Sequence, residues 1–157
     1  MPSLLESRIR SGIQGAAEVL FPENDFGAPD WRSTDMVQRT VDYLFELPPH
    51  RSQVVSALFV AADVMLPPAL RDIRQLPKVP LAKRMAAFER WYDEPYSAMG
   101  QVVGALKATL SMVYFNHPDV VRYIGTVKPC DRPWDHYKVD VDVDALTRHL
   151  DKAGGEA

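Results

Sequence analysis

The chain has 157 residues, of which 46% are hydrophobic and 25% are charged, a length that suits one domain with one continuous core. Its formal charge of −3 gives no net attraction to phosphate, and Lys and Arg are spread along the sequence, so we expect no nucleic-acid partner. A local basic patch is still compatible with this net charge. The single cysteine, Cys130, excludes an intrachain disulfide and a multi-cysteine metal site, and it favours a cytoplasmic protein.

The first predicted element is an amphipathic helix that runs to about Phe21. Ser3 and Glu6 have the spacing of a capping box, and apolar residues then recur at helical intervals. Polar residues interrupt this apolar pattern, so the segment does not have the core of a secretory signal. Pro22 ends the helix, and the following segment, PENDFGAPDW, consists of turn-forming residues.

A second helix is predicted in STDMVQRTVDYLFELPP. Ser33 or Thr34 is expected to be its N-cap, and Asp35 is expected near its positive end. Pro48-Pro49 is expected to stop it. The side chains predicted to face inward are Met36, Val37, Val41, Leu44 and Phe45.

The third predicted helix, from about His50 to Met65, has the broadest apolar face, with Val54, Val55, Leu58, Phe59 and Ala62. We therefore expect it to be the most enclosed helix of the bundle. Its apolar tract is interrupted by Ser56 and Asp63 and closed by Pro67-Pro68. The tract is thus shorter than the roughly 20 residues of a membrane helix, and no membrane span is expected.

A fourth helix is predicted in LAKRMAAFERWYDEP and a fifth from about Tyr96 to Phe115. In the fourth, the residues on one side are Leu81, Met85, Phe88 and Trp91. No alternating strand pair with a hairpin signal occurs. The predicted fold class is therefore all-α, a single-domain bundle of about five main helices with short helices and an extended C-terminal tail.

The stretch NHPDVVRYIGTVKPCDRPW predicts a short helix followed by a change of character. Asn116 or His117 can cap the helix, Pro118 suits its first position and Gly125 suits its left-handed stop. From Thr126 onward, prolines and alternating charge predict an extended tail with a short terminal helix. We expect a helical domain over residues 1–127 and a tail over residues 128–157 that packs on the bundle or on a partner.

Patterns typical of catalysis or metal binding are incomplete in the sequence. The four histidines do not have the helical spacing of di-iron sites, and the Asp140, Asp142 and Asp144 run lacks the Gly and Glu of a calcium loop. No phosphate-binding glycine loop or GxSxG motif is present. Cys130 lies beside Asp131, which disfavours its thiolate, so a packing or interface role is expected. We expect no catalytic, cofactor or metal site in this chain.

Two segments, AAEVLFPENDFGAPDW and LKATLSMVYFNHPDVVRYIGTVKPC, together with FERW between them, resemble the small gamma-type subunit (subunit 3) family of gluconate 2-dehydrogenase. The resemblance covers about a quarter of the chain. It implies a non-catalytic accessory subunit that binds and stabilises a large FAD-dependent oxidoreductase of the glucose-methanol-choline (GMC) type, which acts on sugars, alcohols or related hydroxyl substrates. The FAD would belong to the partner, and a cytoplasmic complex is expected because the chain lacks the twin-arginine signal of many family members.

The expected partner-binding residues are mainly aromatic or apolar side chains outside the main helices, because such residues carry most of the binding energy at interfaces. They are Phe26, Trp31, His117, Tyr123, Ile124, Cys130, Trp134 and Tyr137. Folding of the loop tryptophans back onto the core is the alternative for those residues. For the whole chain, the alternatives are a stand-alone helical ligand-binding or regulatory module, favoured by a pocket between the third and fifth helices, and an independent enzyme.

Overall fold

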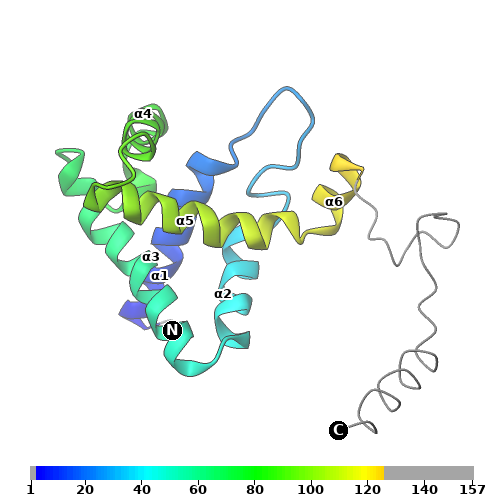
Figure 1. The fold of residues 1–157 in the computed structure, drawn as a ribbon, viewed down its shortest axis with the longest axis horizontal. Coiled ribbons are helices and arrows are strands. Elements are labelled where there is room, and N and C mark those ends of the chain that lie inside the picture. Colours follow the sequence, from blue (N-terminus) through cyan, green and yellow to red (C-terminus); the bar gives the residue numbers. More distant parts are fainter. Residues whose placement is uncertain (1–2, 126–157) are drawn as a thin grey trace, which may run out of the picture. The chain divides into compact units, whose positions relative to one another are not determined.

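Six α-helices and one 3-10 helix occur in residues 3–125, the part of the chain that this computed structural model describes (Figure 1). The predicted all-α fold class is confirmed. The predicted tail, with Cys130, Trp134 and Tyr137, lies outside the described residues. The elements are α1 (Leu4–Leu20), α2 (Met36–Glu46), α3 (Pro49–Ala69), the 3-10 helix η1 (Leu76–Lys78), α4 (Leu81–Tyr92), α5 (Ala98–Phe115) and α6 (Pro118–Ile124).

Helix α1 is the central element, and the prediction that the third helix is the most enclosed was wrong. α1 packs against α2, α3, η1, α4 and α5, and its Ile13, Ala16 and Ala17 are completely buried. Small residues let the neighbouring helices approach α1 from several sides. In α3, by contrast, Val54 is 70% exposed, because only the Phe59 side of that helix faces the core.

Helix α3 continues through Pro67 and Pro68, where the sequence predicted that it would end. The prolines lie in the last turn, where Leu66 and Pro67 are buried. This burial offsets the cost of the two backbone N–H groups that proline lacks. The full helix of 21 residues, with a mean hydropathy of 1.4 over its most apolar window, is long and apolar enough to cross a membrane, although it also packs on α1 as a core helix does. The expectation of no membrane span therefore stays a prediction.

The start of α2 differs from the prediction of a Ser33 or Thr34 cap. Asp35 is the N-cap, with a φ of 46° and no side-chain capping bond. Thr34 is completely buried, and its hydroxyl donates to the carbonyl oxygen of Asp30 over 2.7 Å. The Thr34 hydroxyl is therefore bound to the preceding loop and does not cap α2.

Several side chains predicted to face inward lie on the surface instead. Phe45 is 83% exposed, and Leu81 and Met85 are 40% and 41% exposed. Each lies at the edge of its helix's apolar face, where helical periodicity alone does not decide between core and solvent. Phe88 and Trp91, at the centre of the α4 face, are buried as predicted.

Two buried charged residues attach the segment around η1 to the helices. The carboxylate of Asp63 accepts hydrogen bonds from the Ser11 hydroxyl (2.6 Å), the Leu76 backbone N–H (3.1 Å) and the Arg8 guanidinium (2.8 Å). Arg84 donates to the carbonyl oxygen of Gly15 over 2.7 Å and forms an ion pair with Glu18. Because every partner of these charges is fixed by the fold, their burial is compatible with stability.

Candidate functional site

The loop between α1 and α2 is the longest connection in the described residues, and one asparagine organises its tip. The Asn24 side-chain oxygen accepts from the backbone N–H groups of Phe26 (3.1 Å) and Ala28 (3.2 Å), and its amide donates to the Ala28 carbonyl oxygen over 3.0 Å. Gly27, with a φ of 75°, completes the turn. As a result, Phe26 projects from a hydrogen-bonded turn with 86% of its surface exposed.

The base of the loop is closed by a second set of bonds. The Asp30 carboxylate accepts from the Ser33 backbone N–H over 2.7 Å, and this bond lowers the pKa of Asp30 below its ordinary value. The carbonyl oxygen of Asp30 accepts from the hydroxyls of Ser33 and Thr34. The backbone N–H of Trp31 donates to the Phe21 carbonyl oxygen over 3.0 Å, which joins the two ends of the loop.

Helices α5 and α6 hold the loop from the side. The ring of Tyr114 stacks on Phe21 with centroids 4.0 Å apart, and its hydroxyl donates to the Pro29 carbonyl oxygen over 2.6 Å. Burial raises the pKa of Tyr114, so this hydroxyl keeps its proton and stays a donor. The hydroxyl of Tyr123 on α6 donates to the carbonyl oxygen of Phe26 over 3.1 Å.

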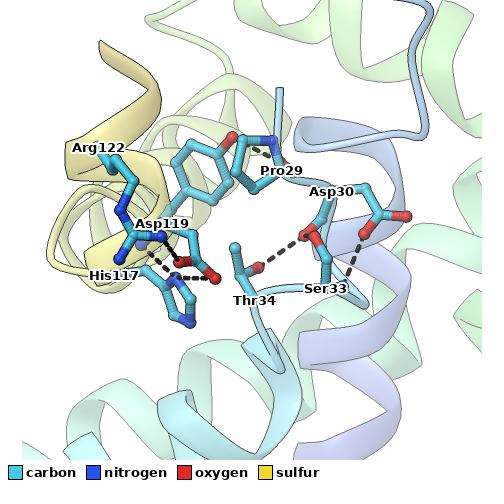
Figure 2. A network of polar contacts seen from close by, with 8 residues as sticks. Pro29, Asp30, Ser33, Thr34, His117, Asp119 and Arg122 are labelled. Carbon is cyan, nitrogen blue, oxygen red and sulfur yellow. Dashed lines mark hydrogen bonds and ion pairs between the residues drawn. The ribbon is translucent and has the colours of Figure 1, made fainter. Parts of the chain in front are cut away.

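Helix α6 begins and ends as predicted. The His117 ring nitrogen Nδ1 accepts from the Asp119 backbone N–H over 3.2 Å, Pro118 is the first helical residue, and Gly125 has a φ of 73°. Arg122 forms an ion pair with Asp119 over 2.9 Å. Figure 2 shows these α6 side chains beside the turn that carries Asp30, Ser33 and Thr34.

We call the exposed residues Phe26, Tyr123 and Ile124 the loop–α6 surface. Tyr123 and Ile124 are 50% and 48% exposed, so three of the predicted partner-binding residues present apolar area to solvent. The structure brings Phe26 and Tyr123 together through the hydrogen bond between them, although 97 residues separate them in the sequence.

The other two predicted partner-binding residues that the structure describes, Trp31 and His117, contact the rest of the fold. Trp31 is partly buried against the core, with the Arg32 guanidinium 5.0 Å from its ring centroid. The His117 side chain is only 14% exposed and caps α6. Sequence reasoning missed Asn24, which positions Phe26, and Tyr114, which holds the loop. The turn-forming composition around Asn24 was a signal for the first, whereas nothing local pointed to the second.

Acidic residues surround a hollow of about 370 Å³ between the loop and α6. Its acidic lining residues are Glu23, Asp30 and Asp119. Across residues 3–125, no group of three or more His, Cys, Asp or Glu side chains is arranged to hold a metal ion. The surface therefore combines exposed aromatic area with negative charge, a combination suited to binding a basic and apolar protein face.

Comparison with protein-family models, with curated protein sequences and with solved structures found no match to this chain.

Proposed function

We propose that this chain is a non-catalytic subunit that binds a larger protein through the loop–α6 surface. The observation that carries the proposal is the exposed Phe26 ring on a turn that Asn24, Tyr123 and Tyr114 hold in place. An exposed aromatic side chain on an ordered loop loses little conformational entropy on binding, which favours its use as an anchor.

The proposed partner is a large FAD-dependent oxidoreductase of the GMC type that acts on sugars, alcohols or related hydroxyl substrates. Two things support this choice: the resemblance of the segments around Phe26 and Tyr123 to the gamma-type subunit family, and the position of these same segments side by side in the fold. The FAD and the oxidation chemistry would belong to the partner. Its docking face would carry Lys or Arg opposite Glu23.

Co-purification of the tagged full-length chain from its native host tests this proposal. We expect a larger protein with a flavin absorbance band to co-purify with the chain. Phe26→Ser should reduce the recovery of the flavoprotein by roughly tenfold or more, the effect of losing an interface anchor. The matched control is Phe45→Ser, because Phe45 on α2 is also a phenylalanine and is 83% exposed.

Equal recovery with the two variants would show that the docking surface lies elsewhere. A larger partner without flavin would contradict the oxidoreductase assignment while leaving the interaction role standing. Thermal unfolding of both variants should match that of the unmodified chain, because neither ring is packed in the core.

A second candidate function, a stand-alone helical ligand-binding or regulatory module, is favoured by a different observation. Between α2 and α5 lies a hollow of about 600 Å³, lined by Arg39, Tyr43, Glu46, Met112, Val113, Phe115 and Asn116. The buried Nε of Arg39 has no hydrogen-bond partner among the residues that the structure describes, although buried donors are normally paired. The feature that the sequence named as favouring this function was a pocket between the third and fifth helices, whereas this hollow lies between α2 and α5. A tagged chain that purifies without any larger protein would favour this function.

A further inference from the structure

A basic hollow is lined by residues at the C-terminal end of α3 and on α4. Figure 1 shows α4 at the opposite end of α5 from α6. It has a volume of about 520 Å³. Three of its lining side chains are cationic, Arg71, Lys83 and Arg90, and the others are small or apolar: Ala69, Leu70, Ala86 and Ala87. Among residues 3–125, no carboxylate lines the hollow, in contrast to the acidic hollow beside α6.

The three cations have no ion-pair partner among the described residues. The nearby Asp72, whose pKa is lowered mainly by Arg74 and to a smaller extent by Lys83, is bound to the Arg74 guanidinium at 2.7 Å. Arg90 lies over the ring of Trp91 at 5.7 Å, a contact that leaves its charge uncompensated. The hollow therefore carries a local excess of positive charge.

This excess is unusual for the chain as a whole. Residues 70–90 contain six Lys and Arg but only two acidic residues, whereas the formal charge of the entire chain is −3. Of these six, only Arg84 is buried and paired with a carboxylate from another helix. On α4, Lys83, Ala86, Ala87 and Arg90 follow helical spacing, so two cations flank a floor of alanines. The local basic patch that the sequence totals left open lies here.

Arg71 has a backbone conformation that gives a second, independent indication of a site. Its φ is 52°, in the left-handed region. Arg71 closes α3 in a Schellman motif. Its backbone N–H donates to the Pro68 carbonyl oxygen over 2.8 Å, and the Asp72 N–H donates to the Pro67 carbonyl oxygen over 2.9 Å. Glycine is the residue normally favoured at this position, because the β-carbon of any other residue makes the left-handed conformation less favourable. Residues that break such a local preference tend to occur at functional sites.

We propose that this basic hollow binds a phosphate group. The ligand class is a phosphate-bearing anion with two or more negative charges, for which the three cations that line the hollow provide charge and hydrogen-bond donors. The alanine floor lets the anion approach α4 closely. The phosphate can belong to a free metabolite or to a lipid headgroup. The lipid source has support from Ile73, which is fully exposed (101%) two residues from Arg71.

Binding of inorganic pyrophosphate to the full-length chain, measured by isothermal titration calorimetry at about 0.15 M salt, tests the proposal. Arg71→Gly separates binding from folding. It removes one cation but places glycine where the left-handed conformation favours it, so the melting temperature should stay the same or rise while pyrophosphate binding weakens roughly tenfold. Lys83→Gln should weaken binding by a similar factor.

The matched control is Arg51→Gln, which removes an exposed cation from the other end of α3 and changes the net charge equally. Flotation with phosphatidic acid vesicles, compared with pure phosphatidylcholine vesicles, distinguishes the source of the phosphate. Binding to the acidic vesicles that is lost in Arg71→Gly and in Ile73→Ser indicates a lipid headgroup, whereas binding of pyrophosphate alone indicates a free metabolite. The proposal is overturned if neither probe binds, or if Arg71→Gly and Lys83→Gln bind as well as Arg51→Gln.

Discussion

Gly12 determines how closely α1 and α3 approach each other. A β-carbon at this position would lie 2.0 Å from the backbone carbonyl oxygen of Phe59. The obstacle is backbone at the middle of α3, so it cannot move aside as a flexible side chain would. The close approach lets Phe59 itself be completely buried against α1.

Gly12→Ala should therefore destabilise the protein by about 1–3 kcal/mol or more, the cost of overpacking a well-packed core. The measurement is urea denaturation followed by circular dichroism. Gly104→Ala on α5 is the control, because a β-carbon there meets nothing within 4 Å. This second variant should gain about 0.5–1 kcal/mol from the better helix propensity of alanine. Equal stability of the two variants would show that the α1–α3 contact is looser than described.

At the scale of elements, a set of polar bonds closes the loop between α1 and α2. Its single ionised anchor is Asp30, whose carboxylate binds the Ser33 N–H. The pKa of Asp30 is lower in the folded chain than its ordinary value. Its contribution to stability is thus complete above the ordinary pKa of an aspartate, about 4, and is lost as the pH falls through the lower, folded pKa.

Asp30→Ala should lower stability by about 1 kcal/mol near neutral pH, the usual effect of losing a side-chain cap. The difference from the unmodified chain should shrink below about pH 4, where the native carboxylate takes up a proton. Thermal unfolding at a series of pH values measures this. A difference that stays constant down to about pH 2 would show that the charge of Asp30 is irrelevant to the loop.

For the whole molecule, the described helices contain their own core and polar networks. The buried apolar residues run from Ile13 on α1 to Val120 on α6, and the two buried charges, Asp63 and Arg84, find their partners within the same set of helices.

A chain that ends at Val127 should therefore unfold cooperatively, with the helical content of the full-length bundle. Circular dichroism at increasing temperature tests this expectation. The same truncated chain, which lacks the predicted docking residues Cys130, Trp134 and Tyr137, should bind the flavoprotein partner more weakly if the tail contributes to docking. Loss of the cooperative transition would instead show that the tail belongs to the core of this domain.

The sequence alone determined where most helices begin and end. The Ser3 cap of α1 and the Gly125 stop of α6 rest on bonds or backbone angles within four residues of each position. Capping and helical periodicity are local effects, so the all-α class and the short α6 could be predicted from residue spacing.

Tertiary structure decided the contacts between residues far apart in the sequence. Asp63 and Ser11 are 52 residues apart, Arg84 and Gly15 are 69 apart, and Tyr114 and Pro29 are 85 apart. Which polar groups meet depends on how the helices pack, and no periodicity encodes it. The same holds for the extension of α3 through two prolines and for the hollow that joins Arg71 to Lys83 and Arg90. Both features depend on how side chains from different helices pack together, which only the assembled core decides.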